Sequence, residues 1–272
     1  MPDLENLISP LKDIIIEAGA AILEVYHSNA PIEVKNKSDN SPVTKADHAA
    51  HIIIDKGLNA LSTLYPVLSE EGGMASFEER GAWQRYWLVD PLDGTKEFIN
   101  KNDEFTVNIA LIDGAEAILG MVYVPVTDIL YYGAKNLGAW KEVKDVKQQI
   151  HSTPVELGQD LTVVGSRRHG AEALEAMLKT IESRFKSINL VSMGSSLKIC
   201  ALAEGTADWY PRLALTSEWD TAAAHAVLSA AGGKIMDTDL TTLEYNQKES
   251  ILNPFFHAVG DRNFDWNSLI KV

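Results

Sequence analysis

The sequence predicts a mixed fold in which an α+β half precedes an α/β half, and three observations carry that prediction. Apolar residues near the N-terminus recur at three- and four-residue steps, the spacing of a helix face. Strand patterns without long intervening helices then follow between residues 67 and 132. From about residue 160, strand and helix patterns alternate, as they do in α/β proteins. We therefore divide the chain into residues 1–155 and 156–272, with the charged stretch 141–159 as the seam.

The first half opens with a helix whose apolar positions run from Ile8 to Tyr26. Ser9 followed by Pro10 is typical of an N-cap and a first helical position, so the helix is predicted to start there. The elements expected next are a strand, a polar loop, a second helix and two short strands: 32–34, 35–42, 46–64, 67–69 and 86–89. Three antiparallel strands complete this half: 105–112, 117–124 and 129–132.

The second half is predicted from alternating apolar runs. Its strands are expected at 161–164, 190–193, 207–211, 234–236 and 257–259. Its helices are expected at 171–184, 195–204 and 221–231. Elements in this order favour a sheet with helices packed on its faces.

The composition indicates a globular protein that does not coat nucleic acid. The 272 residues are 46% apolar and 23% charged, values typical of folded domains. Acids outnumber bases by 38 to 24, and a net charge of -14 would repel a polyphosphate backbone. A small phosphorylated ligand remains compatible with this charge if a divalent cation reverses it locally. The single cysteine, Cys200, excludes an intrachain disulfide and favours a reducing, cytoplasmic compartment, and no membrane span or targeting segment is predicted.

Carboxylates are placed where strands are expected to end. Glu70 and Glu71 follow one short apolar strand, Asp90 follows a second, and Asp93 comes three residues later. Side chains at strand ends project into the crevice beyond a sheet, and paired carboxylates suit hard cations that prefer oxygen ligands. Gly94 would let the backbone approach a phosphate at the start of a helix. Taken singly, Asp93 is interpreted as an N-cap and Glu70-Glu71 as a charged loop; taken together, the pattern favours a metal and phosphate site.

Two longer motifs resemble signatures of the inositol monophosphatase superfamily. Residues 87–95 (Trp-Leu-Val-Asp-Pro-Leu-Asp-Gly-Thr) resemble the first signature, and residues 219–233, which begin Trp-Asp-Thr-Ala-Ala, resemble the second. Residues 44–47 and 69–71 match two further family positions, in order and at family spacing. The resemblance implies a layered αβαβα sandwich and a Mg-dependent, lithium-sensitive phosphomonoesterase.

Finer features resemble one branch of that superfamily, the CysQ-type 3'(2'),5'-bisphosphate nucleotidases. The segments that carry this resemblance are 40–44, 68–71, 87–98, 104–110 and 194–198. Where the inositol phosphatases use an acidic residue near the inositol ring, this chain has Tyr210-Pro211-Arg212. The resemblance implies hydrolysis of adenosine 3',5'-bisphosphate to AMP and phosphate, release of the 3'-phosphate of 3'-phosphoadenylyl sulfate, and a place in sulfate assimilation.

The resemblance also implies a set of site residues. The catalytic set is Asp47, Thr95 and Glu70, in which Thr95 and Asp47 orient the attacking water and accept its proton. The ligands of two Mg²⁺ ions, or of three with Glu71 nearby, are Glu70, Asp90, the Leu92 carbonyl, Asp93 and Asp220, with Asp90 bridging. Two ions about 4 Å apart can polarise a phosphate, activate a water and stabilise the leaving oxygen. Gly94 and Thr95 would hold the phosphate through their amides, beside Glu70, Leu92, Asp93 and Asp220.

The second phosphate of a nucleotide needs its own group of donors. Ser195 and Ser196 open a predicted helix, and Lys198 and Arg212 would neutralise the charge. Residues 166–169 form a second basic candidate. The alternative for Lys198 is a surface lysine that reaches into solvent. Two other residues, His48 and His51, are interpreted as surface histidines because no third ligand lies near them in the sequence.

Alternative functions remain open at this point. One is an inositol-1-phosphate or fructose-1,6-bisphosphate phosphatase of the same superfamily. Another is a non-catalytic metal-binding regulator, which would require the loss of a ligand that this chain retains. The expected partner is a small nucleotide rather than a nucleic-acid polymer. Relatives imply a cytoplasmic protein, with any attachment peripheral and on the cytoplasmic face of the inner membrane, and both monomer and dimer remain open.

Overall fold

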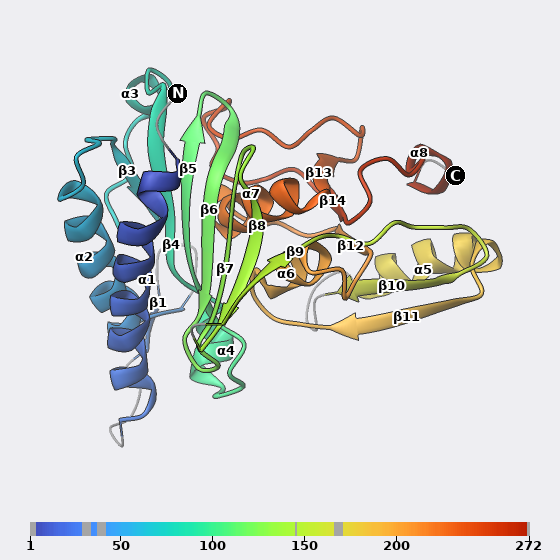
Figure 1. Cartoon of the computed structure of the whole chain (residues 1–272), viewed down its shortest axis with the longest axis horizontal. Helices are drawn as coiled ribbons and strands as arrows, with labels where there is room; N and C mark the ends of the chain where they lie inside the picture. Colours follow the sequence, from blue (N-terminus) through green and yellow to red (C-terminus); the bar gives the residue numbers. More distant parts are fainter. Residues whose placement is uncertain (1–3, 29–33, 37–41, 145, 166–170, 271–272) are drawn as a thin grey trace.

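Helices and sheets alternate in five layers across the molecule (Figure 1). The computed structural model describes residues 4–28, 34–36, 42–144, 146–165 and 171–270. The three helical layers are formed by α1 (Glu5–Tyr26) with α2 (Lys45–Asn59), by α6 (Leu197–Ala203) with α7 (Ala222–Ala231), and by α5 (Ala171–Ile181) with α8 (Asn267–Ile270). A seven-stranded and a five-stranded sheet separate them. The predicted αβαβα sandwich is confirmed.

The larger sheet holds seven strands in chain order. They are β3 (Val67–Ser69), β4 (Arg85–Asp93), β5 (Thr106–Asp113), β6 (Glu116–Val124), β7 (Ile129–Ala134), β8 (Gly138–Val143) and β9 (Val146–Ile150). Only β3 and β4 run parallel; every other neighbouring pair is antiparallel. Helices cover both faces, so Val89 packs toward α1 and α2 while its neighbour Leu88 packs toward α7. This double burial explains the nearly continuous apolar runs in the central strands.

The smaller sheet completes the second half. Its strands are β10 (Asp160–Gly165), β11 (Ser187–Ser192), β12 (Trp209–Arg212), β13 (Lys234–Asp237) and β14 (Phe256–Val259), in the order β11-β10-β12-β14-β13. Alternate residues face opposite layers: Tyr210 joins the cluster beneath α6 and α7, whereas Trp209 joins the cluster with α5 and α8. One hydrophobic cluster contains residues from both sheets, so the two halves share a core.

Close packing holds α7 against the larger sheet. A Cβ at Gly120 of β6 would lie 2.0 Å from the carbonyl oxygen of Ala223 in α7. Glycine at this position therefore permits the close approach that brings the second half of the chain onto the first. The segment immediately before α7 carries Asp220, so the same contact places that residue near the ends of β3 and β4.

Several shorter elements complete the fold. They are β1 (Val34–Asn36), β2 (Pro42–Thr44), α3 (Phe77–Arg80), α4 (Thr95–Ile99) and the 3₁₀ turns Glu182–Arg184 and Glu218–Asp220. Strands β1 and β2 pair antiparallel. The predicted polar loop 35–42 is therefore partly wrong, because its two ends belong to strands; residues 37–41 lie outside the described residues.

Several predicted helix limits are wrong: α5 ends at Ile181 rather than at residue 184, α6 spans Leu197–Ala203 rather than 195–204, and α1 and α2 differ most. Helix α1 begins at Glu5, so Ser9 is not its N-cap and Pro10 lies inside it. Buried Leu7 extends the apolar face one turn upstream, and that burial outweighs the single backbone hydrogen bond that a proline near a helix start removes. Helix α2 ends at Asn59 rather than at residue 64.

The predicted seam is also too long. Strands β8 and β9 extend the larger sheet to Ile150, so only residues 151–159 connect the sheets. The sequence of β9 does not predict a strand, because β9 is an edge strand with exposed residues on both faces and has no apolar alternation. Val146, for example, is 70% exposed. No helix within the described residues is both long enough and apolar enough to cross a bilayer.

Candidate active site

A cavity of about 390 Å³ contains most of the predicted site residues. Its walls come from both halves of the chain. The predicted residues that line it are Glu70, Asp90, Leu92, Asp93, Gly94, Thr95, Ser195, Ser196, Lys198, Arg212 and Asp220. The structure thus brings together residues that lie up to 150 positions apart, from Glu70 to Asp220.

Three carboxylates form a cluster in this cavity. Glu70, Asp90 and Asp220 each offer an oxygen atom, and these atoms lie within 4.8 Å of one another. The parallel pairing of β3 and β4 places Glu70 beside Asp90, because Ser69 pairs with Val89. Asp90 lies within β4, at the irregularity between Asp90 and Asp93, rather than beyond the end of a strand. The irregularity turns the strand toward the cavity and lets the Leu92 N–H donate to Asp90 Oδ1 at 3.1 Å.

The cluster concentrates negative charge in a buried place. Burial raises the pKa of Asp90 well above its ordinary value, and the charges of Glu70 and Asp93 raise it further. Burial and the charges of Asp93 and Glu70 likewise raise the pKa of Asp220. Carboxylates this close are costly to keep ionised together without a compensating cation. An all-oxygen set of this kind fits a hard divalent cation.

Asp93 lies on the cavity wall but outside this three-carboxylate cluster. Its Oδ2 accepts a hydrogen bond from Ser195 Oγ at 2.6 Å and another from the Ser196 N–H at 2.6 Å. The donors expected to meet a second phosphate are therefore directed at a carboxylate here. Asp93 remains close to the cluster in electrostatic terms, since its charge raises the pKa of both Asp90 and Asp220.

Two buried polar residues of β5 support the serines, and the sequence analysis missed both. The hydroxyls of Thr106 and Ser195 share a hydrogen bond of 2.6 Å, and Ser196 Oγ donates to Asn108 Oδ1 at 2.9 Å. Asn108 pairs with Asp90 in the strand register. The available signal was polar residues two positions apart, on one face of an otherwise apolar strand.

The predicted Thr95–Asp47 pair is in hydrogen-bond contact. Thr95 Oγ1 donates to Asp47 Oδ1 at 3.1 Å. The other oxygen of Asp47 accepts from the Thr44 N–H at 2.8 Å, which is one half of the capping box of α2, and also from Thr44 Oγ1 at 2.7 Å. Burial raises the pKa of Asp47, whereas the bonds from Thr44 lower it. The capping box thus fixes one oxygen and leaves the other directed at Thr95.

Gly94 forms the turn between β4 and α4. Its φ of 95° lies in the left-handed region, and a Cβ there would lie 3.1 Å from the carbonyl oxygen of Glu104. Only glycine makes this turn without strain. The turn carries Asp93 and Thr95 on either side into the same cavity.

Lys198 is a buried residue of the cavity wall, so its interpretation as a surface lysine is wrong. Its side chain donates to the carbonyl oxygens of Ser195 at 2.6 Å and Met193 at 3.2 Å, and the residue is 6% exposed. Burial lowers its pKa to about 8. Arg212 lines the same cavity and donates to the carbonyls of Ala214 at 3.1 Å and Leu215 at 3.0 Å. Together with Lys96, these two cations line one cavity with the acidic residues.

The remaining candidates fall into three groups. His48 Nδ1 lies 3.9 Å from Glu71 Oε2, and His51 Nδ1 shares a hydrogen bond of 2.9 Å with the Ser69 hydroxyl. Cys200 is buried in the shared core, where burial raises the pKa of its thiol. The basic candidate at residues 166–169 lies outside the described residues.

Comparisons with known proteins agree with this geometry. A model of the inositol monophosphatase family matches residues 3–263. The chain is 50% identical over 241 residues to the 3'(2'),5'-bisphosphate nucleotidase CysQ of Escherichia coli strain K12, covering 89% of this chain and 94% of the relative. It is 46% identical over 256 residues to the corresponding CysQ of Buchnera aphidicola, covering 93% of each chain. The crystal structure of CysQ from Bacteroides thetaiotaomicron superposes with a TM-score of 0.83 at 38% identity, over 96% of this chain and 99% of that one.

Proposed function

This chain belongs to the inositol monophosphatase family, and we propose that it is a metal-dependent 3'(2'),5'-bisphosphate nucleotidase that converts adenosine 3',5'-bisphosphate to AMP and phosphate. The observation that carries this proposal is a single cavity lined both by the three-carboxylate cluster and by cations that include Lys198 and Arg212. A bisphosphate needs two anion-binding regions, one where a phosphate reacts and one where the other is held. The names of the CysQ relatives support the same substrate class.

The carboxylates fit the metal that the family implies. In the proposal, Glu70, Asp90 and the Leu92 carbonyl hold one Mg²⁺, and Asp90, Asp93 and Asp220 hold a second. Bound there, Mg²⁺ would polarise the phosphate and lower the pKa of a water molecule. Mg²⁺ is proposed over softer metals because the donors are oxygen atoms and no described residue that lines the site carries a thiol or an imidazole.

The residues of the chain then act on the water and the phosphate. Thr95 Oγ1 orients the water, and Asp47, which holds the Thr95 hydroxyl at 3.1 Å, receives its proton. The raised pKa of Asp47 suits that role because a carboxylate of higher pKa is the stronger base. The amides of Gly94 and Thr95 hold the reacting phosphate.

The second phosphate is assigned to Lys198 and Arg212. Charged donors form strong hydrogen bonds to phosphate, and both side chains line the cavity. Ser195 and Ser196 stay in the proposal as the residues that border this phosphate and fix Asp93 through their hydrogen bonds. In this arrangement the metal ligands act on either kind of phosphoester, and the cations select the bisphosphate.

Kinetics on two substrates test the proposal. Phosphate release from adenosine 3',5'-bisphosphate and from inositol 1-phosphate should be followed side by side with Mg²⁺ and again with excess chelator. We expect kcat/KM to favour the bisphosphate by about a hundredfold, since one or two charged hydrogen bonds are worth that factor. A preference for inositol 1-phosphate would instead support an inositol phosphatase, and full activity in chelator would contradict the metal assignment.

The cellular setting is proposed from the resemblance. Removal of adenosine 3',5'-bisphosphate, and of the 3'-phosphate of 3'-phosphoadenylyl sulfate, would support sulfate assimilation in the cytoplasm. Any association with the inner membrane would be peripheral. Growth of a deletion strain on sulfate, compared with growth on cysteine, checks this setting.

A further inference from the structure

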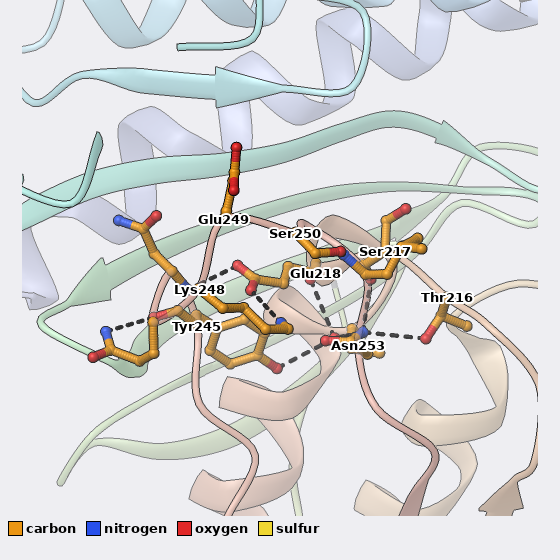
Figure 2. Close-up of polar contacts among 12 residues, drawn as sticks. Thr216, Ser217, Glu218, Tyr245, Lys248, Glu249, Ser250 and Asn253 are labelled. Carbon is orange, nitrogen blue, oxygen red and sulfur yellow. Dashed lines mark hydrogen bonds and ion pairs between the residues drawn. The ribbon is translucent and has the colours of Figure 1, made fainter. Parts of the chain in front are cut away.

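A buried polar network lies behind the segment that carries Asp220 (Figure 2). Residues 245–253, here called the support segment, run beside residues 216–221. Ser217 and Leu252 form an antiparallel bridge, and the Glu218 N–H donates to the Ile251 carbonyl at 2.9 Å. The support segment thus adds backbone pairing to a stretch that otherwise consists of a single 3₁₀ turn.

Asn253 binds both sides of that turn. Its Nδ2 donates to the Ser217 carbonyl at 2.8 Å and to the hydroxyls of Thr216 and Thr221 at 3.1 Å each. Its N–H donates to the Thr216 carbonyl at 2.8 Å. Asn253 is 2% exposed, so water cannot readily replace its hydrogen-bond partners, and losing these bonds would cost free energy of folding. The contacts bracket Asp220, which lies between Ser217 and Thr221 in the sequence.

Glu218 forms the second anchor. Its side chain is fully buried and accepts the Asn246 N–H at 2.8 Å and Lys248 Nζ at 3.2 Å. Figure 2 shows the Glu218 carboxylate turned toward Lys248 of the support segment. Neither Glu218 nor Asn253 is among the described residues that line the active-site cavity, so neither touches the substrate directly.

Arg80 joins the support segment to the first half of the chain. Its guanidinium donates to Asn246 Oδ1 and to the carbonyls of Lys248 and Glu249, and its own carbonyl accepts from Asn246 Nδ2 at 2.7 Å. Arg80 ends α3, which follows Glu70 in the chain and precedes β4. The support segment therefore contacts both the part of the chain that supplies Asp220 and α3, the helix that lies between Glu70 and β4 in the sequence.

We infer that the support segment sets the position of Asp220 relative to Glu70 and Asp90, and that Glu218 and Asn253 are positioning residues for the metal ion. The inference rests on the proposed metal-dependent function. Asp220 itself is held by the Ser217 N–H at 2.8 Å, so any movement of the turn moves the carboxylate. Residues that orient metal ligands in this way commonly change metal affinity about ten- to a hundredfold when they are removed.

The test measures Mg²⁺ affinity in two ways: the Mg²⁺ dependence of activity and the Mg²⁺ dependence of the melting temperature without substrate. Asn253→Ala and Glu218→Ala should each raise the half-saturating Mg²⁺ concentration about tenfold in both measurements. Glu218→Gln should give a smaller shift than Glu218→Ala, because its amide oxygen still accepts the Asn246 N–H although its NH₂ group cannot accept from Lys248. Asp208→Ala is the matched control, since Asp208 accepts the Thr162 N–H at 2.7 Å outside the support segment and alanine removes that acceptor.

The control should have a lower melting temperature than wild type but the same half-saturating Mg²⁺ concentration. The inference is overturned if Asn253→Ala and Glu218→Ala behave like the control, with lower melting temperatures and wild-type Mg²⁺ dependence. If Asn253→Ala fails to fold, Thr216→Val removes one acceptor of Asn253 and should raise the half-saturating concentration about threefold; no change would overturn the inference. A wild-type protein that does not respond to Mg²⁺ in either measurement would contradict the proposed function as well, so the two failures are distinguishable.

Discussion

At the scale of single residues, Asp93 has two kinds of partner: the serines that it contacts in the structure and the cation of the proposed chemistry. In the structure its Oδ2 accepts from Ser195 and Ser196, whereas the proposed chemistry requires it to bind a cation with Asp90 and Asp220. Both roles need an oxygen acceptor, but only the metal role needs a full negative charge. A substitution that keeps the acceptor and removes the charge therefore separates them.

Asp93→Asn is that substitution. An asparagine oxygen still accepts from Ser195 or Ser196, so the melting temperature should change little. Turnover should fall by several orders of magnitude, because charge at the reacting centre supplies the largest part of catalysis in such sites. Circular dichroism and kcat at saturating Mg²⁺ check both expectations. Near-normal turnover would mean that Asp93 serves only as an acceptor for the serines.

Some site residues are visible in the sequence, and others become visible only in the fold. Glu70 and Asp90 could be predicted because each follows an apolar run that forms a strand. The roles of Glu218 and Asn253 could not, because a buried polar residue is explained by its partners, and those partners are distant in sequence. Arg80 illustrates the same limit, since its acceptors lie more than 160 residues away.

At the scale of elements, the turn between β4 and α4 depends on Gly94. Replacement by alanine would force a side chain into the left-handed region, with its Cβ 3.1 Å from a backbone carbonyl. Gly94→Ala should destabilise the protein by about 1–2 kcal/mol and lower kcat/KM, since the turn aims Asp93 and Thr95. Gly73 is the control, because its Cβ would meet nothing within 4 Å.

Gly73→Ala should leave both the melting temperature and kcat/KM close to wild type. Thermal unfolding and steady-state kinetics on the two variants make the comparison. If Gly94→Ala matches Gly73→Ala in both measurements, the turn tolerates a side chain and does not constrain the site.

The turn between β4 and α4 was predicted from the Gly and Asp residues in its sequence. Strand β9 was missed because an exposed edge strand lacks an apolar alternation.

At the scale of the whole molecule, the active site joins two halves that share one core. The predicted split between residues 155 and 156 falls in the connection between the sheets, yet α7 of the second half packs on the larger sheet of the first. Local patterns predicted most strands and helices of each half. They could not predict this contact, because packing between distant helices and sheets leaves no periodic signal in either segment.

The charge on the shared site should make binding of the proposed Mg²⁺ depend on pH. The folded-state pKa values of Asp90 and Asp220 are raised, so the folded protein binds more protons than the unfolded chain between the ordinary and raised values. The stabilisation of the folded state by these bound protons is therefore lost as pH rises through the raised pKa values. Bound Mg²⁺ should then stabilise the folded state in their place. Buried His225 and His257, each with a pKa lowered to about 4, act in the opposite direction below their unfolded value.

Comparison of melting temperatures with and without Mg²⁺ at each pH removes the histidine contribution. The gain from saturating Mg²⁺ should be on the order of 5 °C at pH values above the raised pKa values of Asp90 and Asp220 and should shrink as pH falls through them, because protons compete with the ion. Scanning calorimetry in Mg²⁺ and in chelator measures the gain. The same gain at every pH would contradict the assignment of the ion to these carboxylates.

The most direct single measurement is the effect of Lys198→Met on the ratio of kcat/KM for adenosine 3',5'-bisphosphate to kcat/KM for inositol 1-phosphate. Methionine keeps the bulk of a side chain that is 6% exposed and removes its charge. If Lys198 holds the second phosphate beside the metal cluster, the ratio should fall about ten- to a hundredfold while turnover of inositol 1-phosphate changes little. An unchanged ratio, or an equal loss on both substrates, would contradict a cavity in which carboxylates act on one phosphate and cations select the other.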